Sequence, residues 1–518
     1  MKKKKVIIIG AGPAGLTAGY FLLKDSDKFD VTIVEAAKQV GGISKTISYN
    51  GNRMDLGGHR FFTKNQEILD LWKKIIPIQG LGSYDDKKIG SCGKTFELDG
   101  PDPDESDNVL LVRNRVSRIY YLKKFFDYPI TLKLKTFTNL GFFKTFSSGI
   151  SYLKSLIFKK TENNLENFYI NRFGKKLYNI FFEGYTEKLW GRSPKDIDSS
   201  WGSQRVKGIS ILEVMKNSFG KIFGSKFKSN ETSLIESFYY PKFGPGQMWE
   251  RMAEEFIRLG GKILTDYEVT SVNNNKNNIK SLVCVTEGKT VVLSGDIFIS
   301  SMPIKDLIVG MNKVPKGIHK IALGLPYRDF ITVGLVVKKL KIKNKTSRKT
   351  IGNIIPDCWI YVQSKDVRLG RIQIFNNWSP YMVADIENTI SLGLEYFCNE
   401  GDEMWLEDEI TFKNKAIKEL IAMDILEAEA DVLDFHVEKV KKAYPAYFDT
   451  YSQFDEIKSF LDKFENLYCI GRNGQHRYNN MDHSMETAMV CVNNIINGVR
   501  DRDNIWNVNS DSNYHEKK

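Results

Sequence analysis

The segment LGGHRFFT, residues 56–63, places two glycines directly before a histidine and two aromatic rings. Paired glycines mark either a tight turn or a place where another group comes too close for a Cβ atom. We therefore treat Gly57, Gly58 and His59 as candidate site residues. The alternative for His59 is a hydrogen-bonded structural histidine at a turn.

A second glycine-rich stretch, KKVIIIGAGPAGLTAGYFLL, predicts a buried strand at 6–9, a turn, and a helix that begins near Pro13. In this pattern Gly10 allows the tight turn, Gly12 lets a pyrophosphate approach the backbone, and Gly15 lets the helix pack close to the strand. The diphosphate of a dinucleotide would lie at the helix N-terminus, where free N–H groups and the helix dipole favour negative charge.

A further predicted strand, FDVTIVEA, ends at Glu35, twenty residues after Gly15. That is the position of a carboxylate that accepts hydrogen bonds from the adenosine ribose. Strand, turn, helix, strand and acid follow in the order of a dinucleotide-binding unit. The sequence therefore predicts an α/β protein with a doubly wound, Rossmann-like domain.

A second glycine pair, Gly41 and Gly42, follows the acid. The order GxGxxG, glutamate, GG resembles the flavoproteins with two dinucleotide-binding domains: amine oxidases, phytoene desaturases, protoporphyrinogen oxidases and UDP-galactopyranose mutases. The resemblance implies that the cofactor is FAD and that the backbone at 57–58 passes close to the flavin, with His59 beside it. The residues that the resemblance assigns to the cofactor are Gly10, Gly12, Pro13, Ala14, Gly15, Glu35, Ala36, Gly41, Gly42, Ser44, Gly57, Gly58, His59, Val269, Arg472, Met481 and Asp482.

Two later stretches resemble the remaining parts of such an FAD domain. Residues 260–285, GGKILTDYEVTSVNNNKNNIKSLVCV, predict strands joined by an Asn-rich turn. Val269 falls where the family uses backbone to hold the adenine. Residues 466–499 predict a short strand, a polar glycine loop and a helix from about Asp482, whose start can bind further cofactor oxygens.

The middle of the chain resembles the UDP-galactopyranose mutases in particular. Residues 180–206, IFFEGYTEKLWGRSPKDIDSSWGSQRV, carry an aromatic run, Gly-Tyr-Thr, Lys, Trp-Gly, a proline and a downstream arginine. The resemblance implies that Tyr185 and Trp190 flank the uridine and that Arg205 pairs with the diphosphate. An aromatic face can stack on a base, and a guanidinium can bind phosphate oxygens bidentately. The alternative is that both aromatics belong to a helical core.

The C-terminal motif GRNGQHRYNNMDHSMETAM also resembles the mutases, and it implies that Arg472 lies near the flavin and that Tyr478 reaches the substrate phosphate. One departure is His476, which stands where the mutases have the first tyrosine of a pair. A second departure is that no single residue can be assigned as the second phosphate arginine. The candidates for it are Arg328, Arg368 and Arg371.

The mutase resemblance implies an FAD-dependent pyranose–furanose mutase that acts on a nucleotide-diphosphate sugar. Reduced flavin would attack the anomeric carbon through N5, with NAD(P)H as a candidate external reductant and with His59, Arg205 and Tyr478 in catalytic roles. The first alternative is an FAD-dependent oxidoreductase of the amine oxidase, desaturase or protoporphyrinogen oxidase type. The second is a flavin-binding protein without catalysis. We favour the isomerase.

The charge distribution bears on the partners. The chain has a formal charge of +12, and residues 113–228 alone hold 23 Lys and Arg against 8 Asp and Glu. Such a region could attract an anionic substrate, membrane headgroups or nucleic acid, or it could be a lysine-rich solvated surface. No nucleic-acid motif accompanies it, so we expect no nucleic-acid partner.

Residues 137–160, FTNLGFFKTFSSGISYLKSLIFKK, are aromatic and basic. They could form a helix that lies on a membrane, or an amphipathic helix packed within the substrate region, which we favour. Peripheral membrane contact therefore stays open.

The N-terminal MKKKK with the uncharged run 6–23 resembles a signal peptide or anchor, but the dinucleotide pattern explains it better. We expect a cytoplasmic protein. The six scattered cysteines have no metal-ligand spacing, so we expect no metal site.

The sequence leaves the sugar, the nucleotide and the oligomeric state open. The expected organisation is an FAD-binding domain from residues 1–95, 241–320 and 430–500, a helical substrate region at 96–240, a mixed-sheet substrate region at 321–429, and a polar tail at 501–518.

Overall fold

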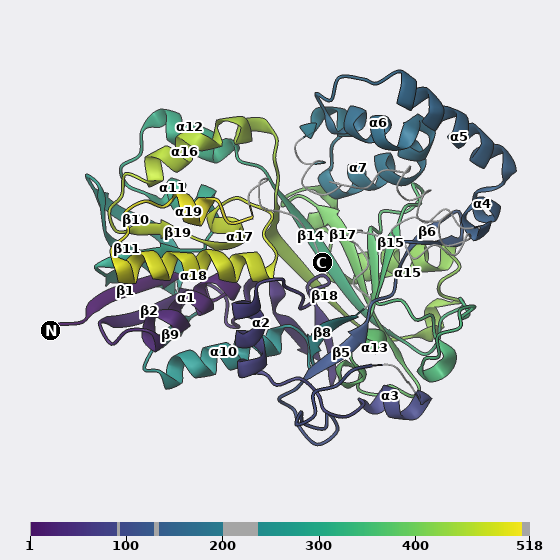
Figure 1. The fold of residues 1–518 in the computed structure, drawn as a ribbon, viewed down its shortest axis with the longest axis horizontal. Helices are drawn as coiled ribbons and strands as arrows, with labels where there is room; N and C mark the ends of the chain where they lie inside the picture. Colours follow the sequence, from purple (N-terminus) through teal and green to yellow (C-terminus); the bar gives the residue numbers. More distant parts are fainter. Residues whose placement is uncertain (1, 91–93, 129–133, 200–201, 203–236, 510–518) are drawn as a thin grey trace.

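The computed structural model describes residues 2–90, 94–128, 134–199, 202 and 237–509 of the 518-residue chain. The chain forms two halves that lie next to each other (Figure 1). One half contains a five-stranded parallel sheet, and the other contains a seven-stranded mixed sheet.

The five-stranded sheet has the order β19-β13-β1-β2-β9, and all of its neighbouring strands are parallel. Four consecutive residues of the first strand, at 6–9, are buried, so both faces of the sheet are covered. This is the continuous apolar run that a parallel α/β sheet requires, and the predicted fold class is confirmed. Its strands are β1 (Lys4–Ile9), β2 (Phe29–Glu35), β9 (Lys262–Thr265), β13 (Ile297–Ser300) and β19 (Leu467–Cys469).

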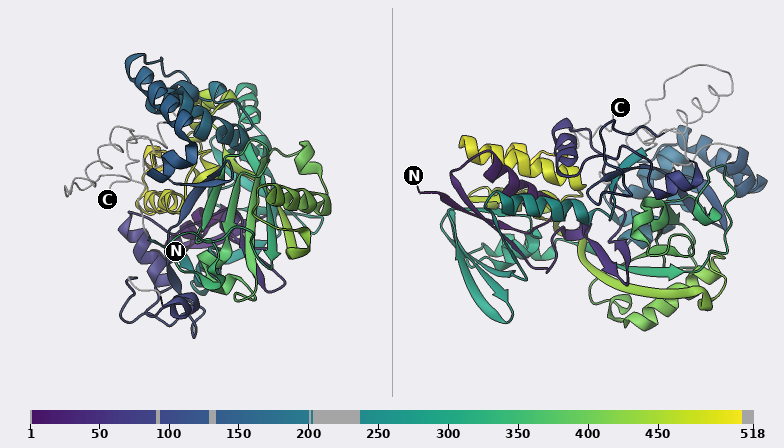
Figure 2. Two further views of the ribbon diagram at one scale, coloured as in Figure 1. Left: turned by 90° about the vertical axis from the view of Figure 1, so that its right-hand side faces the viewer. Right: turned by 90° about the horizontal axis from the view of Figure 1, so that it is seen from below.

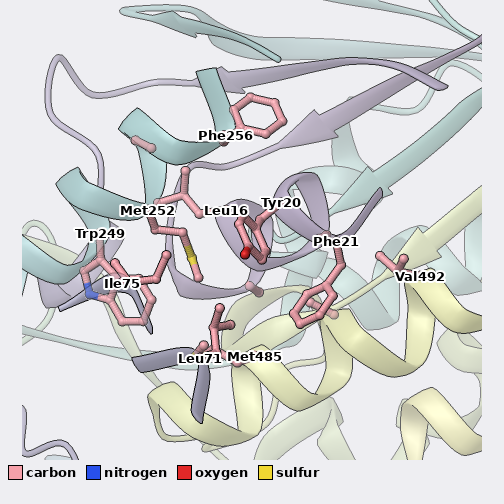
Figure 3. Packing of buried hydrophobic residues seen from close by; sticks show 14 of the residues in the cluster. Leu16, Tyr20, Phe21, Leu71, Ile75, Trp249, Met252, Phe256, Met485 and Val492 are labelled. Carbon is pink, nitrogen blue, oxygen red and sulfur yellow. The ribbon is translucent and has the colours of Figure 1, made fainter. Parts of the chain in front are cut away.

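Three helices from distant parts of the chain pack together beside this sheet: α1 (Pro13–Lys24), α10 (Gly246–Arg258) and α18 (Met481–Asn497). Figure 3 shows apolar side chains of the three helices gathered in one cluster, among them Tyr20 of α1, Met252 of α10 and Met485 of α18. The core of this half is therefore completed only when the C-terminal helix has packed against the N-terminal one.

The alternating run at 262–272 forms two strands that belong to different sheets. Asp266 adopts a positive φ of 62°, and the chain changes sheet at this point. Residues after it form a separate three-stranded antiparallel sheet of β10 (Glu268–Asn275), β11 (Asn278–Thr286) and β12 (Lys289–Ser294). The expected Asn-rich turn joins β10 to β11, where Asn275 pairs with Asn278.

The seven-stranded sheet has the order β18-β14-β17-β16-β15-β6-β7. Helix α15 (Glu409–Ala422) packs its apolar side against the central strands. The strands are β6 (Ser117–Tyr121), β7 (Lys124–Asp127), β14 (Tyr327–Val337), β15 (Trp359–Val362), β16 (Arg371–Ile374), β17 (Ile390–Cys398) and β18 (Val432–Pro445).

This sheet recruits strands across the expected domain boundaries. The strand β18, expected in the third FAD-binding part, pairs with β14 along almost its whole length. The strands β6 and β7 come from the region expected to be helical. A strand's partners decide its sheet, and the local residue pattern does not encode them.

The helical part of the substrate region contains α4 (Leu134–Leu140), α5 (Phe142–Ile157), α6 (Leu165–Tyr178), a π-helical turn (Asn179–Glu183) and α7 (Gly184–Trp190). Figure 2 shows it at the end of the molecule opposite the N-terminus. No described helix has the length and apolarity that a bilayer span needs.

The expected polar tail is partly packed. Trp506 is buried, and the guanidinium of Arg502 donates 2.7 Å to the carbonyl of Phe464. Aromatic and guanidinium anchors hold residues up to 508 against the five-stranded half. The remaining described elements are β3 (Thr46–Tyr49), β4 (Asn52–Asp55), β5 (Leu110–Asn114), β8 (Ser237–Pro241), α2 (Gln66–Ile75), α3 (Tyr84–Ile89), α11 (Ile304–Gly310), α12 (Lys316–Gly324), α13 (Phe375–Trp378), α14 (Glu403–Leu406), α16 (Phe454–Leu461), α17 (Gly471–Gly474) and α19 (Asp503–Trp506).

Candidate functional site

A cavity of about 780 Å³ is lined by residues of both halves of the molecule. One end of it is formed mainly by backbone of the parallel-sheet half, which we call the glycine end. The other end is formed by side chains that include strands of the seven-stranded sheet, which we call the arginine end. The predicted residues that line the cavity are Gly10, Gly12, Pro13, Ala14, Glu35, Ala36, Gly42, Ser44, Gly57, Gly58, His59, Val269, Arg371, Arg472, Tyr478, Met481 and Asp482.

At the glycine end, three positions in and after the first turn are glycine for different physical reasons. A Cβ at Gly15 would lie 1.8 Å from the carbonyl oxygen of Gly10, and Gly10 itself has a φ of +98°. The fold requires both of them. A Cβ at Gly12 would be 3.8 Å from the Cα of Gly42, an ordinary contact, so the protein has room for it. Gly12 and Gly42 therefore form a cradle that faces the cavity and suits a phosphate group.

The glutamate that ends β2 is held in the cavity wall. Its Oε2 accepts a hydrogen bond of 2.7 Å from the backbone N–H of Ala11, and Oε1 accepts one of 2.9 Å from that of Ala37. The carboxylate of Glu35 keeps lone pairs that can accept from ribose hydroxyls.

The second glycine pair forms a left-handed turn next to the cradle. Gly41 has a φ of +106° and Gly42 a φ of +57°, and the Ser44 hydroxyl donates 2.9 Å to the carbonyl of Gly41. Without Cβ atoms, this turn can approach a ligand closely.

Two helices begin at the cavity. The helix α1 starts at Pro13 without a side-chain cap, and α18 starts at Met481 after the capping residue Asn480. Met481 and Asp482, in the first turn of α18, line the cavity. Two positive helix ends in one cavity favour an anionic ligand.

The segment 56–63 lies between the two ends. A Cβ at Gly58 would lie 1.5 Å from the indole of Trp359, so the group that comes too close at this position is Trp359. Gly58 also lines the cavity, and the close approach of its backbone to the flavin stays a prediction. Gly57 does adopt a positive φ of 85°, and its carbonyl lies 3.0 Å from Nδ1 of His59. Burial, reinforced by Arg472, lowers the pKa of His59 to about 4, so the ring is neutral at pH 7.

The guanidinium of Arg472 lies over the ring of Tyr478 at 4.2 Å and donates 3.3 Å to the carbonyl of Asn479. Its Nε and Nη2 atoms are buried and have no hydrogen-bond partner in the part of the chain that the structure describes. A buried cation with two unused donors is costly unless a ligand supplies acceptors. With the Gly12–Gly42 cradle, this observation shows that the residues present fit a bound dinucleotide.

At the arginine end, Arg371 is the one of the three candidate arginines that lines the cavity. Its Nη1 lies 3.1 Å from Oε2 of Glu395 and donates 3.0 Å to the hydroxyl of Tyr444, and its Nε donates 2.5 Å to the hydroxyl of Tyr185. Burial raises the pKa of Glu395, although Arg371 opposes this shift. The guanidinium is thus held rigidly, with its remaining donors available to a ligand.

The other two arginine candidates lie away from the cavity: Arg328 is buried in the protein, and Arg368 is exposed. The side chain of Arg328 donates to the carbonyls of Leu189 and Phe397, at 2.9 and 3.2 Å. Neither Arg328 nor Arg368 lines the cavity.

The structure separates the two aromatic residues that were expected to flank a uridine. The hydroxyl of Tyr185 accepts a hydrogen bond from Nε of Arg371, and Tyr185 itself does not line the cavity. Trp190 is only 3% exposed and packs edge-on to Phe448, so it belongs to the core. Arg205, the expected diphosphate partner, lies outside the described residues.

Sequence reasoning missed several lining residues. Arg60 follows His59 directly and could have been found from that position, because a cation after a glycine turn is a candidate anion ligand. Trp359, Tyr444 and the supporting Glu395 lie on strands with no motif. Only the sheet brings them together.

The described residues contain no group of His, Cys, Asp and Glu that could hold a metal ion. The five cysteines that the structure describes are buried free thiols.

Comparison with known proteins agrees with this geometry. Residues 8–75 match the family described as the NAD(P)-binding Rossmann-like domain. Among curated proteins, coproporphyrinogen III oxidase of Staphylococcus aureus (strain NCTC 8325) is 36% identical over 72 residues, which is 14% of this chain and 16% of that protein. The chain thus matches only a small part of that relative's length.

Solved structures are similar over almost the whole chain. Reduced UDP-galactopyranose mutase superposes with a TM-score of 0.76 at 20% identity, covering 98% of this chain and 99% of that one. A protein from Exiguobacterium sp. 255-15, assigned as a protoporphyrinogen oxidase, superposes with a TM-score of 0.66 at 13% identity, covering 96% and 99%. Together, the N-terminal match and the superposition over almost the whole chain show a Rossmann-like α/β fold similar to that of UDP-galactopyranose mutase.

Proposed function

We propose that the protein is an FAD-dependent mutase that interconverts the pyranose and furanose forms of a nucleotide-diphosphate sugar, with the flavin in its reduced form. The observation that carries the proposal is the arginine end of the cavity, where Arg60 and Arg371 lie with Tyr478. These groups suit a doubly charged diphosphate.

FAD would occupy the glycine end, with its diphosphate at the Gly12–Gly42 cradle and its ribose on Glu35. Arg472, two of whose buried donors have no partner among the described residues, would donate to the cofactor. When bound and reduced, the flavin would supply the nucleophile for the anomeric carbon. An external reductant such as NAD(P)H is needed to reach that state.

The chain's own residues have to stabilise a diphosphate that leaves the sugar and then returns. Arg371 is fixed by Glu395 and two tyrosine hydroxyls, so it presents its charge without reorganising. Such preorganised donors lower the barrier most where charge develops. Tyr478 can donate to a phosphate oxygen, and Arg205 is proposed as a further diphosphate partner. The neutral His59 can accept or donate a hydrogen bond beside the reacting carbon.

The second candidate function is an oxidase. The same arginines can bind carboxylates, and the S. aureus relative is named a coproporphyrinogen oxidase. An oxidase transfers electrons to oxygen or another acceptor, whereas a mutase causes no net redox change.

One experiment separates the two functions. Purified protein loaded with FAD is incubated without oxygen with UDP-galactopyranose, with and without dithionite, and the sugars are resolved by chromatography. We expect isomerisation only in the reduced sample. Oxygen uptake with coproporphyrinogen or putrescine, together with no binding of UDP, would contradict the proposal.

Arg60→Gln tests the arginine end. The loss of one charge-assisted hydrogen bond should raise the KM for the nucleotide sugar about 10–100-fold. Arg53→Gln is the matched control, because Arg53 lies close to Arg60 in the sequence, on strand β4, but stacks on Phe243 outside the cavity. An unchanged KM in Arg60→Gln would show that this arginine does not hold the diphosphate.

A further inference from the structure

Helix α5 (Phe142–Ile157) turns its apolar side chains to the solvent. Phe142, Phe143 and Phe146 are 78%, 86% and 63% exposed. This differs from the expectation that the helix packs its apolar side within the substrate region. The α5 apolar face consists of Phe142, Phe143, Phe146, Ile150, Leu153, Leu156 and Ile157, and Phe158 follows it.

The opposite side of α5 is the one that packs. Its buried residues are Ser148, Tyr152 and Ser155, of which two are small and polar. The neighbouring helix α6 approaches so closely that a Cβ at Gly174 would lie 2.8 Å from the Cα of Tyr152. The helix is therefore fitted to the protein by its small residues, and its large apolar residues are left outside.

The spacing of these residues gives one continuous stripe. Residues 142, 146, 150, 153 and 157 follow each other at intervals of three or four, which places them on one side of a helix. A helix of this length extends about 24 Å. Figure 1 shows it at the outer edge of the molecule, away from the parallel-sheet half.

The charged side chains near the α5 apolar face in the sequence are all positive. Residues 128–161 contain six lysines and no aspartate or glutamate. Lys144, Lys154, Lys159 and Lys160 are exposed. A second copy of the chain placed on this face would bring lysines against lysines, whereas an anionic surface would neutralise them.

We propose that the α5 apolar face inserts into the surface of an anionic lipid bilayer, parallel to it, with the lysines at the lipid phosphates. Helices that lie in the headgroup region of a bilayer typically have phenylalanine and leucine on one side and lysine beside them. The inference stands on α5 alone and does not depend on the proposed mutase activity.

The test is sedimentation of the full-length, FAD-loaded protein with vesicles. We expect binding to vesicles that contain phosphatidylglycerol, weaker binding to pure phosphatidylcholine, and a decrease as salt rises. The variant F142S/F143S/F146S should lower the vesicle-bound fraction about tenfold or more. The variant L406S/I410S is the matched control, because it removes exposed apolar side chains on α14 and α15, at 73% and 54% exposure.

A second readout guards against a folding defect. Phe146→Cys carrying an environment-sensitive fluorophore should report an apolar environment only when anionic vesicles are added. Equal vesicle binding by wild type and F142S/F143S/F146S would overturn the proposal. A dimer in light scattering that disappears in this variant, without vesicle binding, would show that a second copy covers the face instead.

Discussion

The two ends of the cavity are built by different means. The glycine end consists of turns and helix starts, in which the decisive feature at Gly10, Gly12 and Gly42 is the absence of a side chain. The arginine end consists of long side chains such as Arg371, which are held by partners on neighbouring strands. One end is shaped by backbone, and the other by side chains.

The difference has an energetic consequence. A backbone cradle tolerates almost any change elsewhere but fails when a methyl group enters it. A side-chain cluster with a buried charge depends on every member, because one unpaired ion in the interior costs more than the pair contributes.

The largest effect is expected for Gly15→Ala. The added Cβ would lie 1.8 Å from the carbonyl oxygen of Gly10, which cannot move without shifting β1 from α1. We expect a loss of stability on the order of 4 kcal/mol or more, seen as loss of soluble folded protein.

Gly12→Ala is the comparison that sharpens this result. Its Cβ meets protein atoms only at 3.8 Å, so the apoprotein should unfold at the wild-type temperature. The methyl group would occupy the cradle, and flavin affinity should fall about tenfold or more. If both variants lose flavin and stability to the same degree, the distinction between a structural and a ligand-facing glycine is wrong.

The glycine end could be predicted from the sequence because its geometry is local. Strand, turn and helix between 4 and 24 place Gly12, and Glu35 and the Gly41–Gly42 pair follow a short distance further along the chain. Gly58 shows the limit of this reasoning. A glycine pair in the sequence indicates that another group approaches the backbone closely, but only the folded structure identifies that group as Trp359.

The second prediction concerns the arginine end. Arg371→Met leaves the carboxyl of Glu395, which is fully buried, without its cation. Loss of one partner from a buried pair typically costs about 3–5 kcal/mol, so the unfolding temperature should fall clearly. The variant R371M/E395Q should recover much of this stability, and it should still bind flavin but not UDP.

The exposed pair of Arg258 with Glu255 supplies the control, since Arg258→Met removes a similar contact of 2.7 Å at the surface. It should leave the unfolding temperature unchanged, because water screens such a pair. Should R371M/E395Q be no more stable than Arg371→Met, the buried carboxylate is not the source of the cost.

The sequence could not select Arg371 from Arg328 and Arg368, and the reason is physical. All three have similar surroundings along the chain, and only the pairing of β16 with β17 places Glu395 opposite Arg371. For Trp190 the motif suggested a place beside the uridine, whereas the structure buries this side chain in the core. Its neighbours in the core come from residues more than 200 positions away, such as Phe448.

The smallest effect is expected where the two halves of the molecule meet. His476 belongs to the loop before α18, and its Nε2 lies 3.0 Å from the carbonyl of Ala446, which follows β18. Burial lowers the pKa of His476 to about 4, whereas an unfolded histidine titrates near 6.5. Between these values the unfolded chain takes up a proton that the folded chain refuses, so stability falls as the pH falls.

His476→Asn should flatten this slope, since asparagine does not titrate and tolerates the positive φ of 45° at this position. For the wild type, the change from pH 7 to pH 5.5 should cost about 1 kcal/mol through this residue. Thermal unfolding at both pH values measures it, and His59, with its pKa also lowered, leaves a residual slope in the variant. The lost hydrogen bond to Ala446 lowers stability equally at both pH values, so the slope isolates the proton. An unchanged slope would mean that His476 takes up its proton in the folded protein as readily as in the unfolded chain, so that the contact between the two halves at Ala446 is less tightly closed than its packing indicates.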